Sequence, residues 1–291
     1  MIMKKFNIRY GTSLAPQFSK DLDAITPNLA NFDNVKLVPM RRIKKSEEND
    51  GQKKLKRPSL SAILGSIGDK KGLYLWQKNM IDEMGLAGFR KTMTDRLTLG
   101  VRIHSHIEKI VKIRGAENYQ EKEIYEYIDK EKDVMLKNYM KSALPYVFSL
   151  ETSKNAILEK YVKHFELGYQ GRFDAVIPNS ANSLQIVDWK TSPARSTFST
   201  QKEESMSYAT YVKQLAAYAS AFNHDTNFEN FDFVKTGLLV SLNEDGSPAE
   251  LYQVSQEDLE RTFEEFKNEL IKFWEKIDGS TGRNIDFAYK P

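Results

Sequence analysis

The chain has no cysteine among its 291 residues. This absence excludes disulfide scaffolds, thiol catalysis and metal sites built on thiolates. No apolar stretch approaches the roughly 20 residues that a membrane-spanning helix needs, so we expect no membrane partner. Histidine is scarce, with four residues, and their spacing contains no zinc-protease motif.

Two further catalytic motifs are missing, and so is a strong overall charge. No glycine-rich phosphate loop precedes a helix, which argues against nucleoside triphosphate hydrolysis. No Gly-X-Ser-X-Gly elbow is present. The net charge is only +3, although residues 36–57 hold nine Lys/Arg and three Asp/Glu. The rest of the chain is therefore net negative, and any DNA contact there must come from a local patch.

The N-terminal region, residues 1–57, shows little periodicity and predicts a basic, mobile segment. Its first twenty residues are basic, with no acid before Asp21. That pattern is compatible both with a mitochondrial transit peptide and with a solvated basic tail. We expect folded structure to begin near Pro58, with Ser59 capping a short helix.

The rest of the chain divides into a helical part, residues 58–150, and a part of mixed strands and helices, residues 151–291. Apolar spacing predicts helices at 73–93, 95–113 (capped by Asp95) and 119–140 (with Pro145 marking its end). Alternation and turn residues predict strands at 157–167, 169–178, 184–191, 231–242 and 249–254. A polar loop is expected at 192–207, and further helices at 208–222 and 256–277. The order predicts an α/β fold with a mixed central sheet flanked by helices.

The most informative residues are Asp188-Trp189-Lys190, which follow the apolar run 184–187. Strand side chains alternate between faces, so Asp188 and Lys190 share one face. Asp174 lies on the preceding strand, after Gly171. Two carboxylates beside an ammonium predict an Mg²⁺ or Mn²⁺ site for phosphodiester hydrolysis, with Asp174, Asp188 and Lys190 as catalytic residues. The alternative is an ordinary ion pair at the edge of the sheet.

Two more residues are candidate metal ligands. A hairpin about Gly168 would return Glu159 to the side of Asp174, where a third carboxylate would complete the site. His104 lies on the predicted helix 95–113, with Glu108 one turn later, and is a candidate for a metal ligand or a phosphate contact. The alternatives are a solvated Glu159 and a structural His104.

Substrate contacts are expected from a helix and a loop. Gln214 and Tyr218 are four residues apart on the helix 208–222, where they can hydrogen-bond a phosphate or support the metal site. Tyr211 shares their face, and for it we favour plain packing over base stacking. Arg195, in the loop that leaves Lys190, is a candidate contact to a DNA strand.

In order and spacing, these residues resemble the RecB-like branch of the PD-(D/E)XK nuclease superfamily. The shared elements are His104, Glu159, Gly171-X-X-Asp174, Asp188-X-Lys190 and Gln214-X-X-X-Tyr218. The chain departs from the pattern at Phe173, where the name-giving motif has proline. Longer strings, including 188–192 and 223–227, are similar to the mitochondrial genome maintenance exonuclease family.

The resemblance implies metal-dependent cutting of single-stranded DNA from free ends or flaps, in mitochondrial DNA maintenance and in the matrix. By motif, Asp174 and Asp188 would hold Mg²⁺ or Mn²⁺, with support from His104 and Glu159. Lys190 would be the catalytic lysine. Two alternatives remain open: a RecB-like recombination or phage exonuclease that acts on duplex ends, and a catalytically silent DNA-binding relative.

Overall fold

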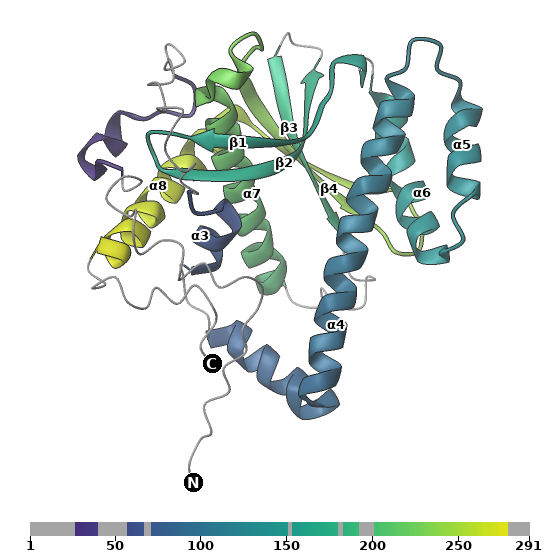
Figure 1. The fold of residues 1–291 in the computed structure, drawn as a ribbon, viewed down its shortest axis with the longest axis horizontal. Helices are drawn as coiled ribbons and strands as arrows, with labels where there is room; N and C mark the ends of the chain where they lie inside the picture. Colours follow the sequence, from purple (N-terminus) through teal and green to yellow (C-terminus); the bar gives the residue numbers. More distant parts are fainter. Residues whose placement is uncertain are drawn as a thin grey trace, which may run out of the picture.

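The computed structural model describes residues 27–39, 57–66, 71–150, 153–179, 183–191 and 201–278. At its centre lies a five-stranded sheet in the order β1-β2-β3-β4-β5 (Figure 1). The strands are β1 (Ile157–His164), β2 (Tyr169–Asn179), β3 (Ser183–Thr191), β4 (Val234–Leu242) and β5 (Glu250–Val254). Strands β3 and β4 are parallel, and the other neighbours are antiparallel. The predicted mixed sheet is confirmed.

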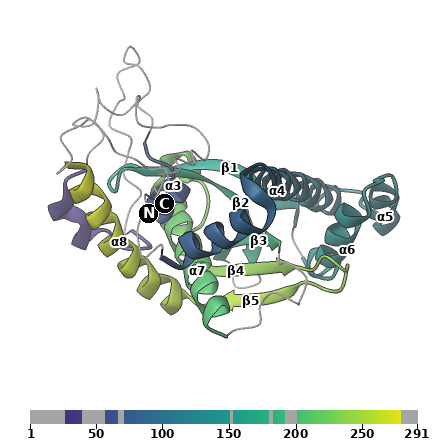
Figure 2. The ribbon, with the colours of Figure 1, turned by 90° about the horizontal axis from the view of Figure 1, so that it is seen from below.

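One face of the sheet is covered by α7 (Gln201–His224), α8 (Gln256–Asp278) and the short α3 (Leu60–Ser66) (Figure 2). Helix α7 is the crossover that two parallel strands require, because a tight turn cannot join them. It is rich in alanine on its buried side, including Ala216 and Ala219, and therefore packs close to the sheet. The predicted cap of α3 is confirmed, since Ser59 Oγ accepts the Ala62 N–H at 3.2 Å.

The opposite face is covered by α4 (Lys71–Arg114) and α6 (Val134–Ser149), and α5 (Glu121–Asp129) packs against these two helices. The prediction that Asp95 starts a helix is wrong: Asp95 lies inside α4 and pairs with Lys91 at 2.7 Å. The break falls at Gly85 instead, where a φ of 73° is tolerated only by a residue without a Cβ. This break produces the bend near the start of α4 in Figure 1.

The predicted helix at 119–140 is in fact two helices. Asp133 accepts the Met135 and Leu136 N–H groups and so begins α6. Pro145 lies inside α6 rather than at its end. The neighbouring Leu144 and its turn are buried in the core, so tertiary packing outweighs the lost backbone hydrogen bond.

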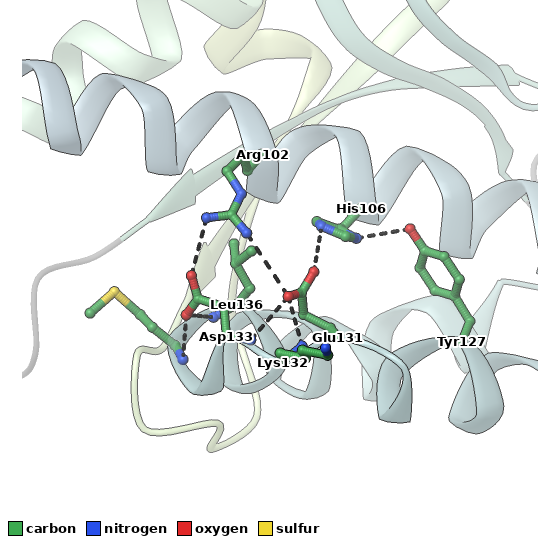
Figure 3. A network of polar contacts seen from close by, with 8 residues as sticks. Arg102, His106, Tyr127, Glu131, Lys132, Asp133 and Leu136 are labelled. Carbon is green, nitrogen blue, oxygen red and sulfur yellow. Dashed lines mark hydrogen bonds and ion pairs between the residues drawn. The ribbon is translucent and has the colours of Figure 1, made fainter.

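A polar network joins α4 to the two helices beside it (Figure 3). His106 Nδ1 lies 2.8 Å from the Tyr127 hydroxyl, and its Nε2 lies 3.3 Å from Glu131 Oε2. Arg102 donates to Asp133 at 3.1 Å. No role was predicted for His106. These contacts fix the part of α4 that faces the sheet.

Residues 27–39, expected to be mobile, instead pack into the core. The 3₁₀ helix η1 (Leu29–Asn34) and the residues after it bury three apolar side chains, Phe32, Val35 and Leu37. The buried Lys267 ammonium donates to the Phe32 and Val35 carbonyls at 3.0 and 2.9 Å, and Asn223 donates to the Leu37 carbonyl at 3.0 Å. A segment this short has no measurable periodicity, which is why the sequence did not reveal it.

Over the described ranges, every helix is too short or too polar to cross a membrane.

Candidate active site

The site lies where β2 and β3 stop pairing. Their ladder ends at the pair Ala175–Val187, and the same register places Asp174 opposite Asp188 one residue further on. There the Trp189 N–H donates to Asp174 Oδ2 at 2.8 Å. The carboxylate therefore satisfies a backbone donor at the end of the ladder, and this contact holds Asp174 next to the strand that carries Asp188.

Asp188, Lys190 and Gln214 form a closed ring of polar contacts. The Lys190 ammonium lies 2.6 Å from Asp188 Oδ2 and donates to Gln214 Oε1 at 3.1 Å. Gln214 Nε2 in turn donates to Asp188 Oδ1 at 3.4 Å. A glutamine suits this position because its amide offers both an acceptor and donors. The shared face predicted for Asp188 and Lys190 is confirmed by their contact.

Burial sets the charge states of this pair. Asp188 is 3% exposed, and burial raises its pKa to about 6 against the opposing effect of Lys190. For Lys190, burial lowers the pKa, but the adjacent Asp188 outweighs it and the net shift is upward. Lys190 is therefore a fixed positive charge at neutral pH.

A second cluster joins α4 to the sheet. His104 Nδ1 lies 3.2 Å from Asp174 Oδ1 and 3.8 Å from Glu159 Oε1. Atoms of these three side chains that could ligate a metal all lie within 4.8 Å of one another. The prediction that a hairpin about Gly168 places Glu159 beside Asp174 is thus confirmed. Asp188 is not part of this group, because Lys190 and Gln214 engage its carboxylate.

The Glu159 side chain has one carboxylate oxygen that is buried without a hydrogen-bond donor. Its Oε2 pairs with Arg172 at 2.6 Å, but its buried Oε1 accepts no hydrogen bond. An uncompensated buried oxygen is costly. The Glu159 backbone also has a φ of 50°, which is uncommon for a residue with a side chain. Strain and an unsatisfied oxygen at one position are typical of a functional site.

The electrostatics of the cluster favour a cation. Burial opposes the protonation of His104, but the hydrogen bond and charge of Asp174 outweigh it and raise the pKa of His104. Burial and the charge of Asp174 also raise the pKa of Glu159. Because metal ligands must be deprotonated, a divalent cation would replace a proton in this cluster. The residues present therefore fit a hard divalent cation.

Tyr218 and Tyr211 buttress the site from α7. The Tyr218 hydroxyl hydrogen-bonds with Gln214 and with the Arg172 backbone, and burial raises the pKa of the phenol, so it keeps its proton. The Tyr211 ring lies over the Lys190 ammonium, 4.5 Å from ring centroid to Nζ. Tyr211 therefore makes a cation–π contact with Lys190, in addition to the packing that was predicted for it.

The glycine of the Gly-X-X-Asp motif has a packing role. A Cβ at Gly171 would lie 2.5 Å from Cε1 of the buried Tyr218. We expect Gly171→Ala to lower the free energy of unfolding by about 1–3 kcal/mol, because the ring has no room to retreat. Urea unfolding measures this. Gly100→Ala is the control: nothing lies within 4 Å of its Cβ, so in the helix it should be neutral or slightly stabilising. Equal effects of the two substitutions would contradict the prediction.

The loop that follows Lys190 was predicted to span residues 192–207 and to include Arg195. Arg195 lies outside the described residues. The predicted loop 192–207 is too long at its C-terminal end, because residues 201–207 already belong to α7. Arg172 is a further residue of the site that was not predicted, although its position two residues before Asp174 on a strand places both on one face.

Comparison with known proteins identifies relatives of the chain. Residues 81–288 match the family described as the PD-(D/E)XK nuclease superfamily. Mitochondrial genome maintenance exonuclease 1 of Homo sapiens is 29% identical over 197 residues, which cover 66% of this chain and 51% of that protein. Its Xenopus tropicalis counterpart is 30% identical over 197 residues, covering 66% and 50%. The chain therefore spans about half the length of these curated relatives.

Among solved structures, the one titled "Crystal structure of SSO0001" superposes with a TM-score of 0.27 and 16% identity. The superposition covers 54% of this chain and 70% of that one. This likeness is too slight to support an argument.

Proposed function

Because the chain belongs to the PD-(D/E)XK nuclease superfamily, we propose that it is a metal-dependent exonuclease of single-stranded DNA. It would hydrolyse phosphodiester bonds from free ends or flaps. The observation that carries the proposal is the pairing of two clusters at one point of the sheet. One is the group of His104, Glu159 and Asp174, whose ligand atoms are close enough together to hold a metal ion. The other is the buried Lys190 ammonium, which is paired with Asp188.

The cation is proposed to be Mg²⁺ or Mn²⁺, held by Glu159 and Asp174 with His104, and with Asp188 beside them. Carboxylate oxygens are the ligands that these hard cations prefer. When bound, the cation would neutralise phosphate charge and make water more acidic. The Oε1 of Glu159, buried without a hydrogen-bond donor, is an oxygen that such a cation would satisfy.

Lys190 is proposed to be the catalytic cation of the protein itself. Its ammonium can hydrogen-bond the attacking water or an oxygen of the phosphate that gains negative charge in the transition state. Asp188, Gln214 and Tyr211 hold the ammonium in place from three directions. Preorganisation of this kind removes the cost of reorienting the charge during the reaction.

The proposal also specifies whether the DNA is single-stranded or duplex, whether cleavage requires a free DNA end, and in which compartment the protein acts. The names of the two curated relatives support exonuclease activity and a role in mitochondrial genome maintenance. We therefore propose single-stranded, free-ended or flapped DNA as the substrate and the mitochondrial matrix as the compartment.

The test is a cleavage assay with the purified chain, Mg²⁺ or Mn²⁺ and three DNA substrates: linear single-stranded, circular single-stranded and linear duplex. We expect only the linear single strand to be degraded, and a chelator to stop the reaction. Equal degradation of the duplex would favour an enzyme that acts on duplex ends. DNA binding without any cleavage would leave a catalytically silent relative and overturn the proposal.

A further inference from the structure

Two exposed tyrosines form a second feature on the face of the sheet that carries Asp188. Tyr208 on α7 and Tyr252 on β5 are 41% and 40% exposed. Their ring centroids lie 5.9 Å apart, with the ring planes tilted by 58°. Over the described ranges, no other pair of contacting rings has both members this exposed. Both rings keep part of their surface in solvent, where a flat ligand can reach it.

The register of the sheet places this pair close to the reacting centre. Asp188 lies beside Leu239 on β4, and Leu239 lies beside Tyr252 on β5. Residues aligned across neighbouring strands share a face, so Tyr252 and Asp188 point to the same side. Two strand spacings separate them by about 10 Å. A nucleotide next to the cleaved phosphate can cover that distance.

Helix α7 connects the same two points. Tyr208 is one turn before Tyr211, and the Tyr211 ring covers the Lys190 ammonium. Aromatic rings therefore continue from the catalytic lysine outward to the exposed pair. The surface is an extension of the proposed active site, and its occupant is expected to be the same molecule.

The chemistry of the pair selects a base rather than a phosphate. The Tyr252 hydroxyl donates to Glu250 Oε2 at 2.6 Å, which places a carboxylate beside the ring. That charge repels phosphate, whereas the uncharged face of a base can still stack on the rings. Within a duplex the bases stack on one another and hide these faces, whereas an unpaired nucleotide exposes them.

We propose that Tyr208 and Tyr252 form a stacking platform for an unpaired base next to the phosphate that is cleaved. The proposal rests on the proposed function and adds to it a physical basis for choosing single strands. The platform is sequence-tolerant, because every base has an aromatic face.

The test compares kcat/KM of the wild type with that of a Tyr208→Ala/Tyr252→Ala variant. The substrates are a linear single-stranded oligonucleotide and matched oligonucleotides with one abasic nucleotide at successive positions from the cleaved end. We expect the double substitution to lower kcat/KM about 5- to 100-fold on intact DNA. At one abasic position the kcat/KM of the wild type should fall by a similar factor. The double alanine variant should lose little further activity at that position, because it has already lost the stacking contact.

The controls separate stacking from folding and from charge. Tyr208→Phe/Tyr252→Phe keeps both rings and should keep most of the activity. Tyr125→Ala removes an exposed ring from α5, away from the site, and should have no effect. The loss in the double alanine variant should persist at raised salt, because stacking releases no counterions.

Three results would overturn the proposal: unchanged kcat/KM in the double alanine variant, an equal loss on every abasic substrate, or a loss that the phenylalanine variant shares. If the wild type cleaves no DNA, the proposed function fails instead. The platform is then tested alone by fluorescence anisotropy with the same oligonucleotides in Ca²⁺, where the double alanine variant should bind more weakly to intact DNA only.

Discussion

Replacing Asp188 with asparagine should reduce DNA cleavage by about 10³-fold or more, with little change in stability. The substitution keeps the size of the side chain but removes the charge that holds Lys190 and adjoins the proposed cation. Losing one preorganised electrostatic contact in a buried site typically costs 10²–10³ in rate, and here two functions depend on one carboxylate. Initial rates on linear single-stranded DNA measure the loss.

The stability of this variant follows from the raised pKa of Asp188. An acid whose pKa is raised by folding, here to about 6, opposes folding once the pH is high enough to ionise it. Asparagine removes that cost at neutral pH. In return Lys190 loses its ion-pair partner, but it keeps the contacts with Gln214 and Tyr211. The two effects oppose each other, so urea unfolding at pH 7 should show a small change.

Asp129→Asn is the matched control for Asp188→Asn. Asp129 is 77% exposed on α5 and lies 3.9 Å from Lys137, so it is also an aspartate beside a lysine. Exposed pairs contribute little to stability. Its substitution should leave both activity and unfolding unchanged. If the Asp188 variant retained more than about a tenth of wild-type activity, Asp188 would have no place in the proposed mechanism.

The second large effect is on stability. Phe32→Ala should lower the free energy of unfolding by about 3–5 kcal/mol, because the ring is 1% exposed and its removal leaves a cavity. That is a large part of the 5–15 kcal/mol by which domains are typically stable. Urea or thermal unfolding, followed by circular dichroism, measures it. Activity per folded molecule should not change, since Phe32 is a core residue and not one of the proposed catalytic residues.

Two further variants test how residues 27–39 are held. Lys267→Met removes the donor that satisfies the Phe32 and Val35 carbonyls, and should cost about 1–3 kcal/mol per carbonyl left without a partner. Asn31→Ala changes an exposed residue of the same segment and should lie within about 0.5 kcal/mol of the wild type. A Phe32 variant as stable as the Asn31 variant would show that the segment adds nothing to the core.

The sheet and most of the site were predictable from sequence, because they depend on short-range patterns. Alternation and turn glycines located the five strands to within a few residues. The two-residue period alone placed Asp188 and Lys190 on one face. Glu159 and Asp174 followed from a single hairpin about Gly168. Each inference needed only the geometry of neighbouring strands.

The predicted helix boundaries are wrong where several residues could each start, break or end a helix. Asp95 has the chemistry of a helix cap, but in the exposed stretch of α4 it serves equally well as the partner of Lys91. Gly85 and Gly100 look alike in the sequence, yet only Gly85 breaks the helix. Pro145 normally ends a helix, and here burial of its neighbours keeps α6 continuous. Such choices are settled by tertiary contacts, which no local pattern contains.

Other features were not predictable because they join distant parts of the chain. Tyr208 and Tyr252 meet only through the fold, as do Asn223 and Leu37. No rule of spacing connects residues so far apart. The role of Arg172 is the exception, since its partner Glu159 lies across a hairpin that was predicted.

The contacts of Lys267 with Phe32 and Val35 also constrain the order in which the protein can fold during synthesis. Lys267 follows Phe32 by 235 residues. A ribosome adding about 5–20 residues per second needs on the order of 10–50 s to cover that distance. Throughout that time the Phe32 and Val35 carbonyls lack the ammonium that satisfies them in the folded protein. The segment 27–39 is therefore fully held only after α8 has emerged, and until then it is a place where a chaperone can bind the nascent chain.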